Sequence, residues 1–254
     1  MKRQKITVTG SLGTALSVQL DLPDNEEPRH YAVYSHCFTC SKNLKSINNI
    51  AHAMVKNGWG FVRFDFTGVG ESAGDFIETN FASDVADIHA VVRGLRDTGK
   101  SVELLVGHSL GGAASVQAAS EDDGIKAVAT ISAPFHGGDV ARRFLHLKDQ
   151  ILKSGSAEIE IGGQRFTIGE HFMNDAELPD LTATLRSLKA AILIMHSPRD
   201  ETVDAENASR LFMAAHHPKS FVSLADADHL LSNKDDACYA GQLISAWASR
   251  YVKS

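Results

Sequence analysis

The motif GHSLG at residues 107–111 is the part of the sequence that most clearly carries chemistry. It follows the apolar run at 103–106 and opens an Ala- and Gly-rich stretch, which is the strand, turn and helix context of a nucleophile elbow. Side chains at Gly107 and Gly111 would crowd so sharp a turn, and glycine there leaves the Ser109 hydroxyl exposed. The motif therefore predicts a serine nucleophile, with an ordinary glycine-rich turn as the alternative.

His229 and Asp200 are expected to complete the catalytic group. A serine hydroxyl is a weak nucleophile at neutral pH, so it needs a base to accept its proton and an acid to orient that base. Asp200 follows the apolar run at 191–195 and His229 follows the run at 221–224. The order serine, aspartate, histidine is typical of folds with this elbow, and all three residues then lie at the carboxyl ends of strands, where ligands bind.

Three other aspartates compete with Asp200 for the role of the acid. Asp226 and Asp228 flank the histidine, and Asp204 lies one helical turn beyond Asp200. Asp204 is better placed as the N-cap of the next helix, where its carboxylate would accept hydrogen bonds from free backbone donors. Asp200 is therefore the expected acid.

Backbone N–H donors for a developing oxyanion are expected at Leu110 and Phe38. Such donors usually come from the residue after the nucleophile and from the loop after the third strand, which here reads HCFTC at residues 36–40. The alternative for this loop is a plain surface turn. Contacts with the substrate are expected from these loops and from the insert described below, at His36, Cys37, His108, Phe135, Phe144 and Phe166.

The three cysteines, Cys37, Cys40 and Cys238, are too few and too unevenly spaced for a disulfide framework, so we expect reduced thiols. The C-x-x-C pair is a weak signal for a redox dithiol, and no ligand set at a usual spacing supports zinc. No metal or cofactor is expected. The loop at 63–72 lacks the motifs of a phosphate-binding loop, and Asp65 and Ser72 are expected to form hydrogen bonds within a tight turn at the floor of the site.

Apolar runs rich in β-branched residues alternate with segments of helical period, which predicts an α/β fold with a mostly parallel eight-stranded sheet and helices on both faces. The strands are expected at 6–8, 16–22, 31–35, 61–64, 103–106, 127–131, 191–195 and 221–224. The helices are expected near 46–57, 81–97, 110–120, 204–216 and 236–252.

The alternation stops between Pro134 and Leu188, so an inserted cap is expected at about 136–187 within a single domain spanning residues 1–254. Val140, Phe144, Leu147 and Ile151 repeat at helical spacing, while apolar residues alternate on both sides of Gly162-Gly163 as in a hairpin. The helix and the hairpin each carry an apolar stripe that would promote aggregation if it were exposed. The cap is therefore expected to cover Ser109 and to line an acyl pocket.

The composition is that of an ordinary globular protein, with 43% hydrophobic and 22% charged residues. A net charge of −6 without a basic stripe argues against nucleic acid as a partner. No secretory signal and no apolar stretch of about 18 residues occurs, so the expectation is a cytoplasmic protein without membrane association. A homo-oligomer is left open.

The segments HCFTCSKNL at 36–44 and RFDFTG at 63–68 resemble those of a bacterial α/β-hydrolase family often fused to an OsmC-type domain. The resemblance spans nearly the whole chain and implies the α/β-hydrolase fold and an acyl hydrolase. Cysteines in the first motif are usual in that family, and a broader similarity to feruloyl-esterase-like hydrolases supports Phe38 and Leu110 as oxyanion donors. The chain ends at Ser254, just after the last expected helix, which leaves only a separate OsmC-type partner open.

The leading functional hypothesis is a serine carboxylesterase that cleaves esters of modest size through an acyl-enzyme. Short acyl chains of about two to six carbons should be favoured, since one cap must both cover the site and leave an entrance. A thioesterase or a peptidase could use the same triad, because the leaving group and the pocket shape decide between them. A non-catalytic binding protein with the same fold is the alternative from another class.

Overall fold

The computed structural model describes residues 1–252 and contains one large sheet in which all eight predicted strands are confirmed. The strands are β1 (Lys2–Thr9), β2 (Ala15–Leu22), β3 (Tyr31–Ser35), β4 (Gly60–Phe64), β5 (Val102–His108), β6 (Ala127–Ile131), β9 (Ala191–His196) and β10 (Lys219–Ser223). Their spatial order is β1-β2-β4-β3-β5-β6-β9-β10. In this spatial order, the neighbouring strands β4, β3, β5, β6, β9 and β10 all pair in parallel. Strands β1 and β2 add an antiparallel edge next to β4.

Both faces of the sheet are apolar, because side chains of successive strand residues point to opposite faces. Val33 and Leu105 contribute to the core on one face, and their neighbours Tyr34 and Leu104 contribute to the core on the other. Continuous apolar strands of this kind must be covered by helices on both sides.

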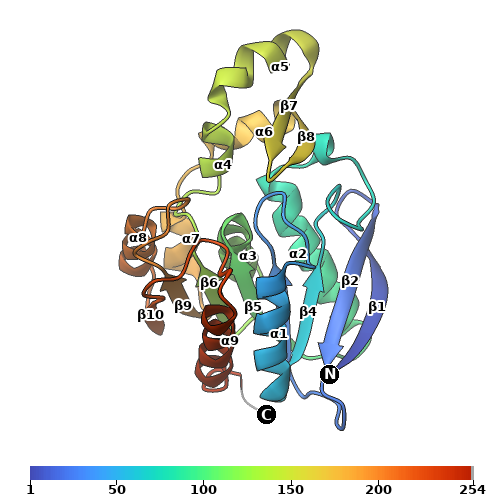
Figure 1. Ribbon diagram of the computed structural model, residues 1–254, viewed down its shortest axis with the longest axis vertical. Helices are drawn as coiled ribbons and strands as arrows, with labels where there is room; N and C mark the ends of the chain where they lie inside the picture. The colour runs from blue at the N-terminus through green and yellow to red at the C-terminus, as the bar shows by residue number, and fades with distance from the viewer. Residues whose placement is uncertain (253–254) are drawn as a thin grey trace.

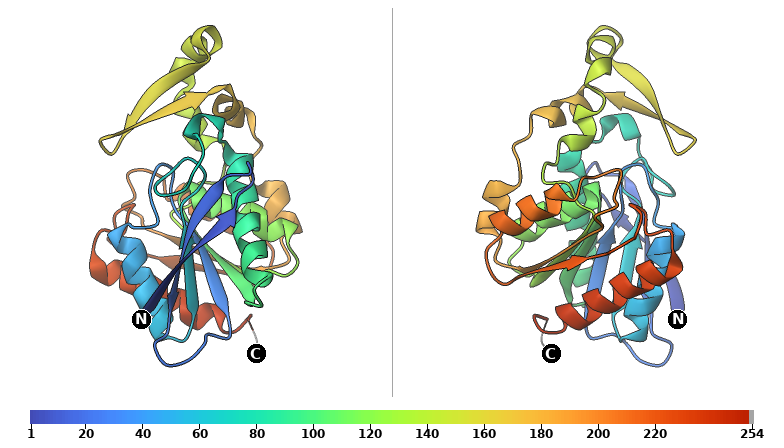
Figure 2. Two further views of the ribbon diagram at one scale, coloured as in Figure 1. Left: turned by 90° about the vertical axis from the view of Figure 1, so that its right-hand side faces the viewer. Right: turned by 60° about the vertical axis from the view of Figure 1, so that its left-hand side comes forward.

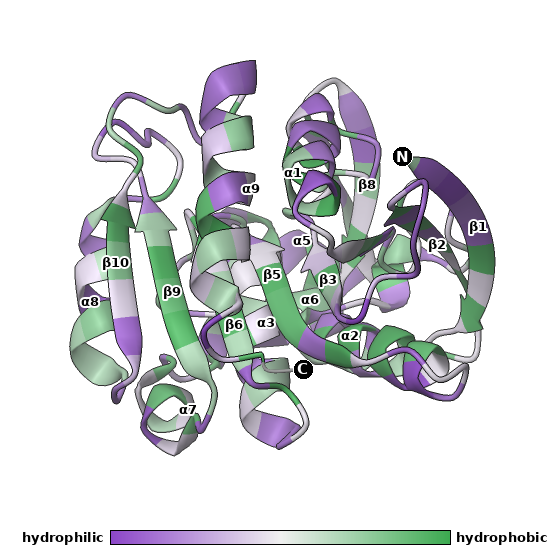
Figure 3. Ribbon diagram, turned by 90° about the horizontal axis from the view of Figure 1, so that it is seen from below, coloured by the Kyte–Doolittle hydropathy of each residue, from purple (hydrophilic) through white to green (hydrophobic). Residues whose placement is uncertain are grey.

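Helices α1 (Lys45–Lys56) and α9 (Lys234–Ala248) cover one face of the sheet. The other face is covered by α2 (Phe81–Arg96), α3 (Leu110–Glu121), α7 (Thr182–Ser187) and α8 (Glu206–Ala214). Figure 3, which looks along the layers from below, shows α1 and α9 on one side of the strands and α2 and α7 on the other. The five predicted helices are confirmed, whereas α7 was not predicted.

The insert between β6 and β9 forms a small cap above the carboxyl ends of the parallel strands (Figures 1 and 2). Its elements are α4 (Asp139–Arg142), η2 (Leu145–Leu147), α5 (Lys148–Ser154), β7 (Ser156–Ile161), β8 (Gln164–Gly169), α6 (Glu170–Asn174) and η3 (Asp175–Glu177). The predicted hairpin is confirmed, with both Gly162 and Gly163 at positive φ in its turn. The expected helix along residues 140–151 is broken into α4, η2 and α5.

The cap has an apolar cluster of its own, which includes Ile151, Ile159, Ile168 and Phe172. The last part of the predicted insert does not belong to it, because Leu181 and Leu185 pack into the main core beside α3 and α8. The cap is therefore smaller than residues 136–187. Among residues 1–252, no helix combines the length and the apolar character needed to cross a membrane.

Candidate active site

The turn between β5 and α3 holds Ser109 in a sharp conformation, with φ of 53° and ψ of −125°. A Cβ atom at Gly107 would lie 2.3 Å from the carbonyl oxygen of Gly111, and one at Gly111 would lie 2.3 Å from that of His36. Both clashes are with backbone, which a rotamer change cannot relieve. The two glycines therefore allow β3, β5 and α3 to approach closely enough to form the turn, and strain of this kind is often found at functional sites.

Asp200 and His229 lie in the loops after β9 and β10, and the structure brings their side chains together. His229 Nδ1 lies 2.8 Å from Asp200 Oδ2 and 3.0 Å from Oδ1. Backbone N–H groups of Thr202 and Val203 donate to Oδ1, each at 2.9 Å. Burial favours the neutral acid, but the hydrogen bonds from His229 and Val203 outweigh it and hold the pKa of Asp200 below its usual range. The histidine tautomer with a proton on Nδ1 leaves Nε2 as an acceptor.

Ser109 and His229 line one cleft with a volume of about 770 Å³, which opens below the cap. Among the described residues, no hydrogen bond joins Ser109 Oγ to the imidazole ring. Such contacts are often long in a free enzyme and tighten when the substrate binds. The cleft is of the size that binding sites for small molecules have.

The loop after β3 borders the same cleft and carries Phe38 next to Ser109. Neither Phe38 N–H nor Leu110 N–H donates to a backbone acceptor among residues 1–252. The Phe38 ring stacks on Phe172 of the cap, with ring centroids 5.4 Å apart. The two predicted oxyanion donors thus lie in the two loops that meet beside the serine.

The expectation of reduced thiols is wrong for Cys37 and Cys40, which form a disulfide with Cα atoms 5.3 Å apart. Cys40 N–H donates to the Cys37 carbonyl oxygen at 3.1 Å, and this tight turn brings the two sulfur atoms together. The C-x-x-C spacing was only a weak signal for a redox dithiol, because a spacing does not show whether the loop brings the two sulfur atoms together. Cys238 in α9 is free.

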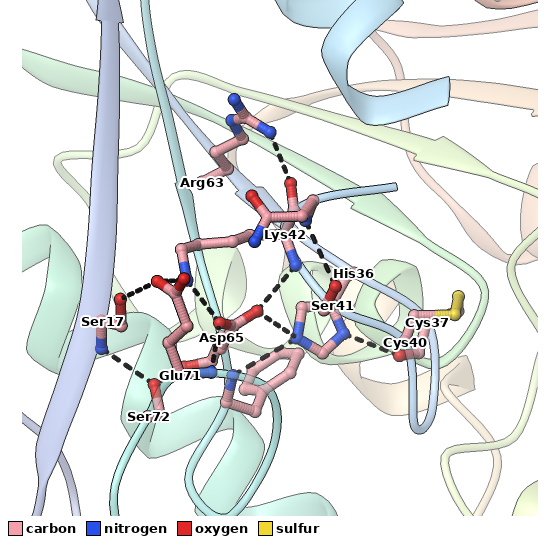
Figure 4. Close-up of polar contacts among 12 residues, drawn as sticks. Ser17, His36, Cys37, Cys40, Ser41, Lys42, Arg63, Asp65, Glu71 and Ser72 are labelled. Carbon is pink, nitrogen blue, oxygen red and sulfur yellow. Dashed lines mark hydrogen bonds and ion pairs between the residues drawn. A yellow bond between two sulfur atoms is a disulfide. The ribbon is translucent and has the colours of Figure 1, made fainter. Parts of the chain in front are cut away.

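A network of charged side chains around a buried ion pair holds the loop after β3 at its far end (Figure 4). Lys42 and Asp65 are both fully buried, and the Asp65 carboxylate accepts from Lys42 Nζ at 2.5 Å and from Lys42 N at 2.7 Å. Glu71 N–H also donates to Asp65, and the Glu71 carboxylate accepts from Lys42 Nζ at 2.9 Å. The predicted hydrogen bonding in the tight loop is confirmed, since Ser72 Oγ donates to the Asp65 carbonyl oxygen.

His36 anchors the near end of the loop and does not line the large cleft. Its Nδ1 donates to the Cys37 carbonyl oxygen at 2.7 Å, and its Nε2 accepts from Phe66 N–H at 3.3 Å. Burial lowers the pKa of His36, which fits this neutral form. The residue borders a separate small void of about 20 Å³.

His108 lies below the site, where its Nε2 donates to the His229 carbonyl oxygen at 2.7 Å. Burial, with a smaller effect of the nearby His229, lowers the pKa of His108 to about 3, so the ring is neutral. His108 thus supports the histidine loop and does not border the cleft, contrary to its expected contact with substrate.

The other residues expected to contact the substrate divide into two groups. Cys37 and Phe144 line the cleft. Phe135 is buried in the main core, and Phe166 packs against Phe76 with ring centroids 5.0 Å apart, so neither borders the cleft. The sequence pattern identified Phe135 and Phe166 as apolar residues near the site but did not show which way they point.

The sequence patterns did not identify several residues that the structure places at the site. His196 Nε2 donates to the Val203 carbonyl oxygen at 2.9 Å and lies 3.6 Å from Asp200 Oδ2, so it supports the loop that carries Asp200. The cleft is also lined by Asp139, Arg143, Ile161, Asn207 and Leu230. Only Ile161, beside the predicted hairpin turn, could have been placed near the site from its sequence. Among residues 1–252, no group of three or more potential ligands is arranged to hold a metal ion.

Comparison with known proteins gives one family and many solved structures of the same fold. Residues 28–171, which include Phe38 and Ser109, match the family described as serine aminopeptidase, S33. The esterase domain of a Rhodothermus marinus protein is 41% identical, covers 100% of both chains and superposes with a TM-score of 0.80. Est1E from Butyrivibrio proteoclasticus, solved with ferulic acid, is 21% identical over 95% of this chain and 98% of its own, with a TM-score of 0.82.

A putative hydrolase from Agrobacterium vitis shares 19% identity over 96% of this chain and 98% of its own, with a TM-score of 0.77. No curated protein sequence matches the chain. The expected fold is confirmed. Since the family match covers more than half of the sequence and the Rhodothermus marinus domain is similar along its whole length, the chain belongs to the serine aminopeptidase S33 family of α/β-hydrolases.

Proposed function

We propose that this hydrolase is a serine esterase that cleaves carboxylic esters through an acyl-enzyme on Ser109. The observation that carries the proposal is the hydrogen bond of 2.8 Å between His229 and Asp200, in a cleft that Ser109 also lines. A buried carboxylate with a lowered pKa stays ionised at neutral pH and stabilises an imidazolium. The esterase domain that is 41% identical over its whole length supports the same activity.

In the first half of the reaction, Ser109 Oγ attacks the ester carbonyl carbon while His229 Nε2 accepts the hydroxyl proton. The carbonyl electrons move to the oxygen, where the N–H groups of Phe38 and Leu110 would donate to the oxyanion. When the tetrahedral intermediate collapses, the bond to the alcohol oxygen breaks, and the alcohol leaves with the proton from His229. An acyl group remains on Ser109.

In the second half, a water molecule repeats the attack on the acyl carbon. His229 accepts a proton from the water and returns it to Ser109 Oγ as the acyl–oxygen bond breaks, which releases the acid. Throughout the reaction, the Asp200 carboxylate accepts the hydrogen bond from His229 Nδ1 and holds the imidazole in place. Asp204 has another task, since its carboxylate accepts from Glu206 N–H at 2.7 Å at the start of α8.

We further propose that the substrates are esters of modest size. Apolar groups of Val140, Phe144, Ile161 and Leu230 line it, and the cap limits its height. We therefore keep short acyl chains of about two to six carbons as the proposed substrates. A separate OsmC-type partner, a homo-oligomer and a cytoplasmic location stay predictions from the sequence.

A fluorophosphonate probe together with p-nitrophenyl acetate hydrolysis tests the proposal. The wild type should be labelled on Ser109, and Ser109→Ala and His229→Ala should each lower kcat/KM by about 10³-fold or more. Asp200→Asn should cost somewhat less. A folded, contaminant-free Ser109→Ala protein with near-wild-type turnover would disprove the assignment, and an unlabelled wild type would favour a binding protein.

A peptidase is the second candidate, because the matched family is described as serine aminopeptidase. Asp139 and Asp204 line the cleft, where a substrate ammonium group would compete for Asp139 with Arg142, whose guanidinium lies 3.0 Å from the Asp139 carboxylate. The test compares amino acid p-nitroanilides with esters and thioesters of the same acyl group. Faster turnover of the anilides, with loss in Asp139→Asn, would select the peptidase.

A further inference from the structure

The loop between β3 and Lys42 is attached to the core at both ends. His36 bonds to the Cys37 carbonyl oxygen and to Phe66 N–H at one end, and the buried Lys42–Asp65 pair holds the other (Figure 4). Among the described residues, the middle of the loop makes no hydrogen bond or ion pair to the core, and its contacts there include the packing of the Phe38 ring against Phe76 and Phe172. Instead, the Cys37–Cys40 disulfide closes a ring that contains the residue proposed as an oxyanion donor, Phe38.

The ring also contains a backbone conformation that needs support. Thr39 has a φ of 59°, in the left-handed region that a β-branched residue adopts only at a cost. Inside the ring, Cys40 N–H donates to the Cys37 carbonyl oxygen and Thr39 Oγ1 donates to that of Phe38. With the disulfide open, Thr39 is free to relax toward negative φ. This rotation turns the adjoining Phe38–Thr39 peptide, and the preceding Cys37–Phe38 peptide, which carries the Phe38 N–H, can then shift with it.

The disulfide is within reach of a small molecule, because both cysteines line the cleft that also contains Ser109 and His229. Cys37 is only 4% exposed, whereas Cys40 is partly exposed. A thiolate entering the cleft would therefore attack Cys40 Sγ.

We propose that the Cys37–Cys40 disulfide positions the Phe38 N–H for oxyanion stabilisation, and that a small thiol switches the enzyme to a slower form by reducing it. This inference rests on the proposed esterase function. It makes the two cysteines positioning residues that act through Phe38, and it makes the ester-cleaving rate depend on the thiol–disulfide balance around the protein.

The reduction proceeds by two thiol–disulfide exchanges. The first thiolate bonds to Cys40 Sγ as the bond to Cys37 breaks, and Cys37 leaves as a thiolate. A second thiolate attacks the external sulfur of this mixed disulfide and releases Cys40 as a thiolate. Both cysteine thiolates take up protons, so two external thiols are oxidised to their disulfide while the protein gains two thiols.

The expected effect is a lower kcat with an intact fold. Removing one oxyanion donor entirely costs about 10²- to 10³-fold in kcat, whereas here the donor is displaced and Leu110 N–H stays. Because the ends of the loop remain attached, we expect reduction to lower kcat about tenfold and to change KM by less than about twofold.

The experiment compares the oxidised protein with protein treated with dithiothreitol, which is removed by gel filtration before the assay. Thiol titration should find one thiol in the oxidised form and three in the reduced form. In the reduced form kcat for p-nitrophenyl butyrate should fall about tenfold, and the Ki of a trifluoromethyl ketone should rise by about the same factor, because its hemiketal oxyanion uses the same donors. Reoxidation with oxidised glutathione should restore both values.

Two variants serve as controls for this comparison. The double variant Cys37→Ser/Cys40→Ser should show the lower kcat in either condition, while Cys238→Ser should respond like the wild type. A reduced wild type with three thiols and full kcat would overturn the proposal, as would a loss of secondary structure by circular dichroism on reduction. Absence of Ser109-dependent turnover in both forms would instead refute the esterase function, and this inference with it.

Discussion

The two loops that meet beside the proposed oxyanion are built in opposite ways. The elbow after β5 is fixed by missing side chains, since any Cβ at Gly107 or Gly111 would collide with backbone at 2.3 Å. The loop after β3 is fixed by side chains, namely the Cys37–Cys40 disulfide and the buried pair between Lys42 and Asp65. The two proposed oxyanion donors are thus held in different ways. Steric exclusion fixes the elbow that carries Leu110, and crosslinks fix the loop that carries Phe38.

This difference determines how each loop should fail. In the elbow, a single added Cβ atom collides with backbone atoms, and no neighbouring side chain can move to relieve the collision. A crosslinked loop shares its support among several bonds, so the loss of one bond weakens the loop without removing it. The elbow should therefore be the more sensitive of the two in activity, and the loop the more sensitive to solution conditions.

Among the tests of this difference between the two loops, the largest effect is expected for Gly111→Ala. Its Cβ would lie 2.3 and 2.4 Å from the carbonyl oxygens of His36 and Ser35, so α3 and β3 must separate. Since both proposed donors move apart, kcat/KM should fall by about 10²-fold or more. Steady-state kinetics on p-nitrophenyl acetate checks this, with Ser120→Ala at the far end of α3 as the control. Full activity in Gly111→Ala would show that the elbow tolerates a side chain.

Lys42→Met tests the crosslinked loop through stability. The substitution leaves the fully buried Asp65 carboxylate without its ammonium partner. In comparable buried pairs, removal of one partner lowers the free energy of unfolding by about 3–5 kcal/mol. Urea unfolding followed by circular dichroism measures the loss, and the double variant Lys42→Met/Asp65→Asn should recover part of it. The exposed pair Lys189–Asp123 provides the control, because Lys189→Met should not change the unfolding midpoint measurably. Equal effects of the two lysine variants would contradict the role of burial.

Asp175 tests whether the attachment of the cap also depends on charge. Its carboxylate accepts from Phe81 N–H at 2.6 Å at the start of α2, and burial raises the pKa of Asp175 to about 6. Between about pH 4 and 6 the native state therefore holds a proton that the unfolded chain has lost, so the free energy of unfolding falls as the pH rises through this range.

Asp175→Asn should remove this part of the pH dependence, because an amide does not titrate and its oxygen can still accept from Phe81 N–H. Relative to the variant, the wild type should lose about 1–2 kcal/mol between pH 4 and 7. Urea unfolding of both proteins across this range provides the measurement. Parallel stability curves would show that Asp175 does not titrate in the native state near pH 6.

The smallest effect is expected for acyl-chain preference. Phe144 lines the cleft, whereas Phe166 packs against Phe76 away from it. Phe144→Ala should therefore change the ratio of kcat/KM for hexanoate and acetate esters by about three- to tenfold, and Phe166→Ala should change it less. A chain-length series of p-nitrophenyl esters on both variants decides this. Superimposable profiles for the wild type and Phe144→Ala would show that the cap does not set specificity.

The success of sequence reasoning depended on how local each feature is. The elbow, the strands and the hairpin at Gly162-Gly163 depend on residues that are adjacent in the chain, and all were predictable. The orientations of Phe135 and His108 were not, because a strand or turn residue near the site can point into the cleft or into the core. Helix α7 was missed because it is short and its one buried leucine, Leu185, packs against helices that are distant in the sequence.

The sequence by itself determined the α/β order of elements, the position of the elbow and the chain order of Ser109, Asp200 and His229, because patterns of apolar residues and glycines act over short distances. Only the tertiary structure decided that Lys42 is a buried partner of Asp65, that His108 holds the His229 loop, and that Cys37 and Cys40 are joined beside the cleft. Lys42–Asp65 and His108–His229 join segments 23 and 121 residues apart. The strength of such contacts depends on burial and geometry that are set by the packing of the whole sheet.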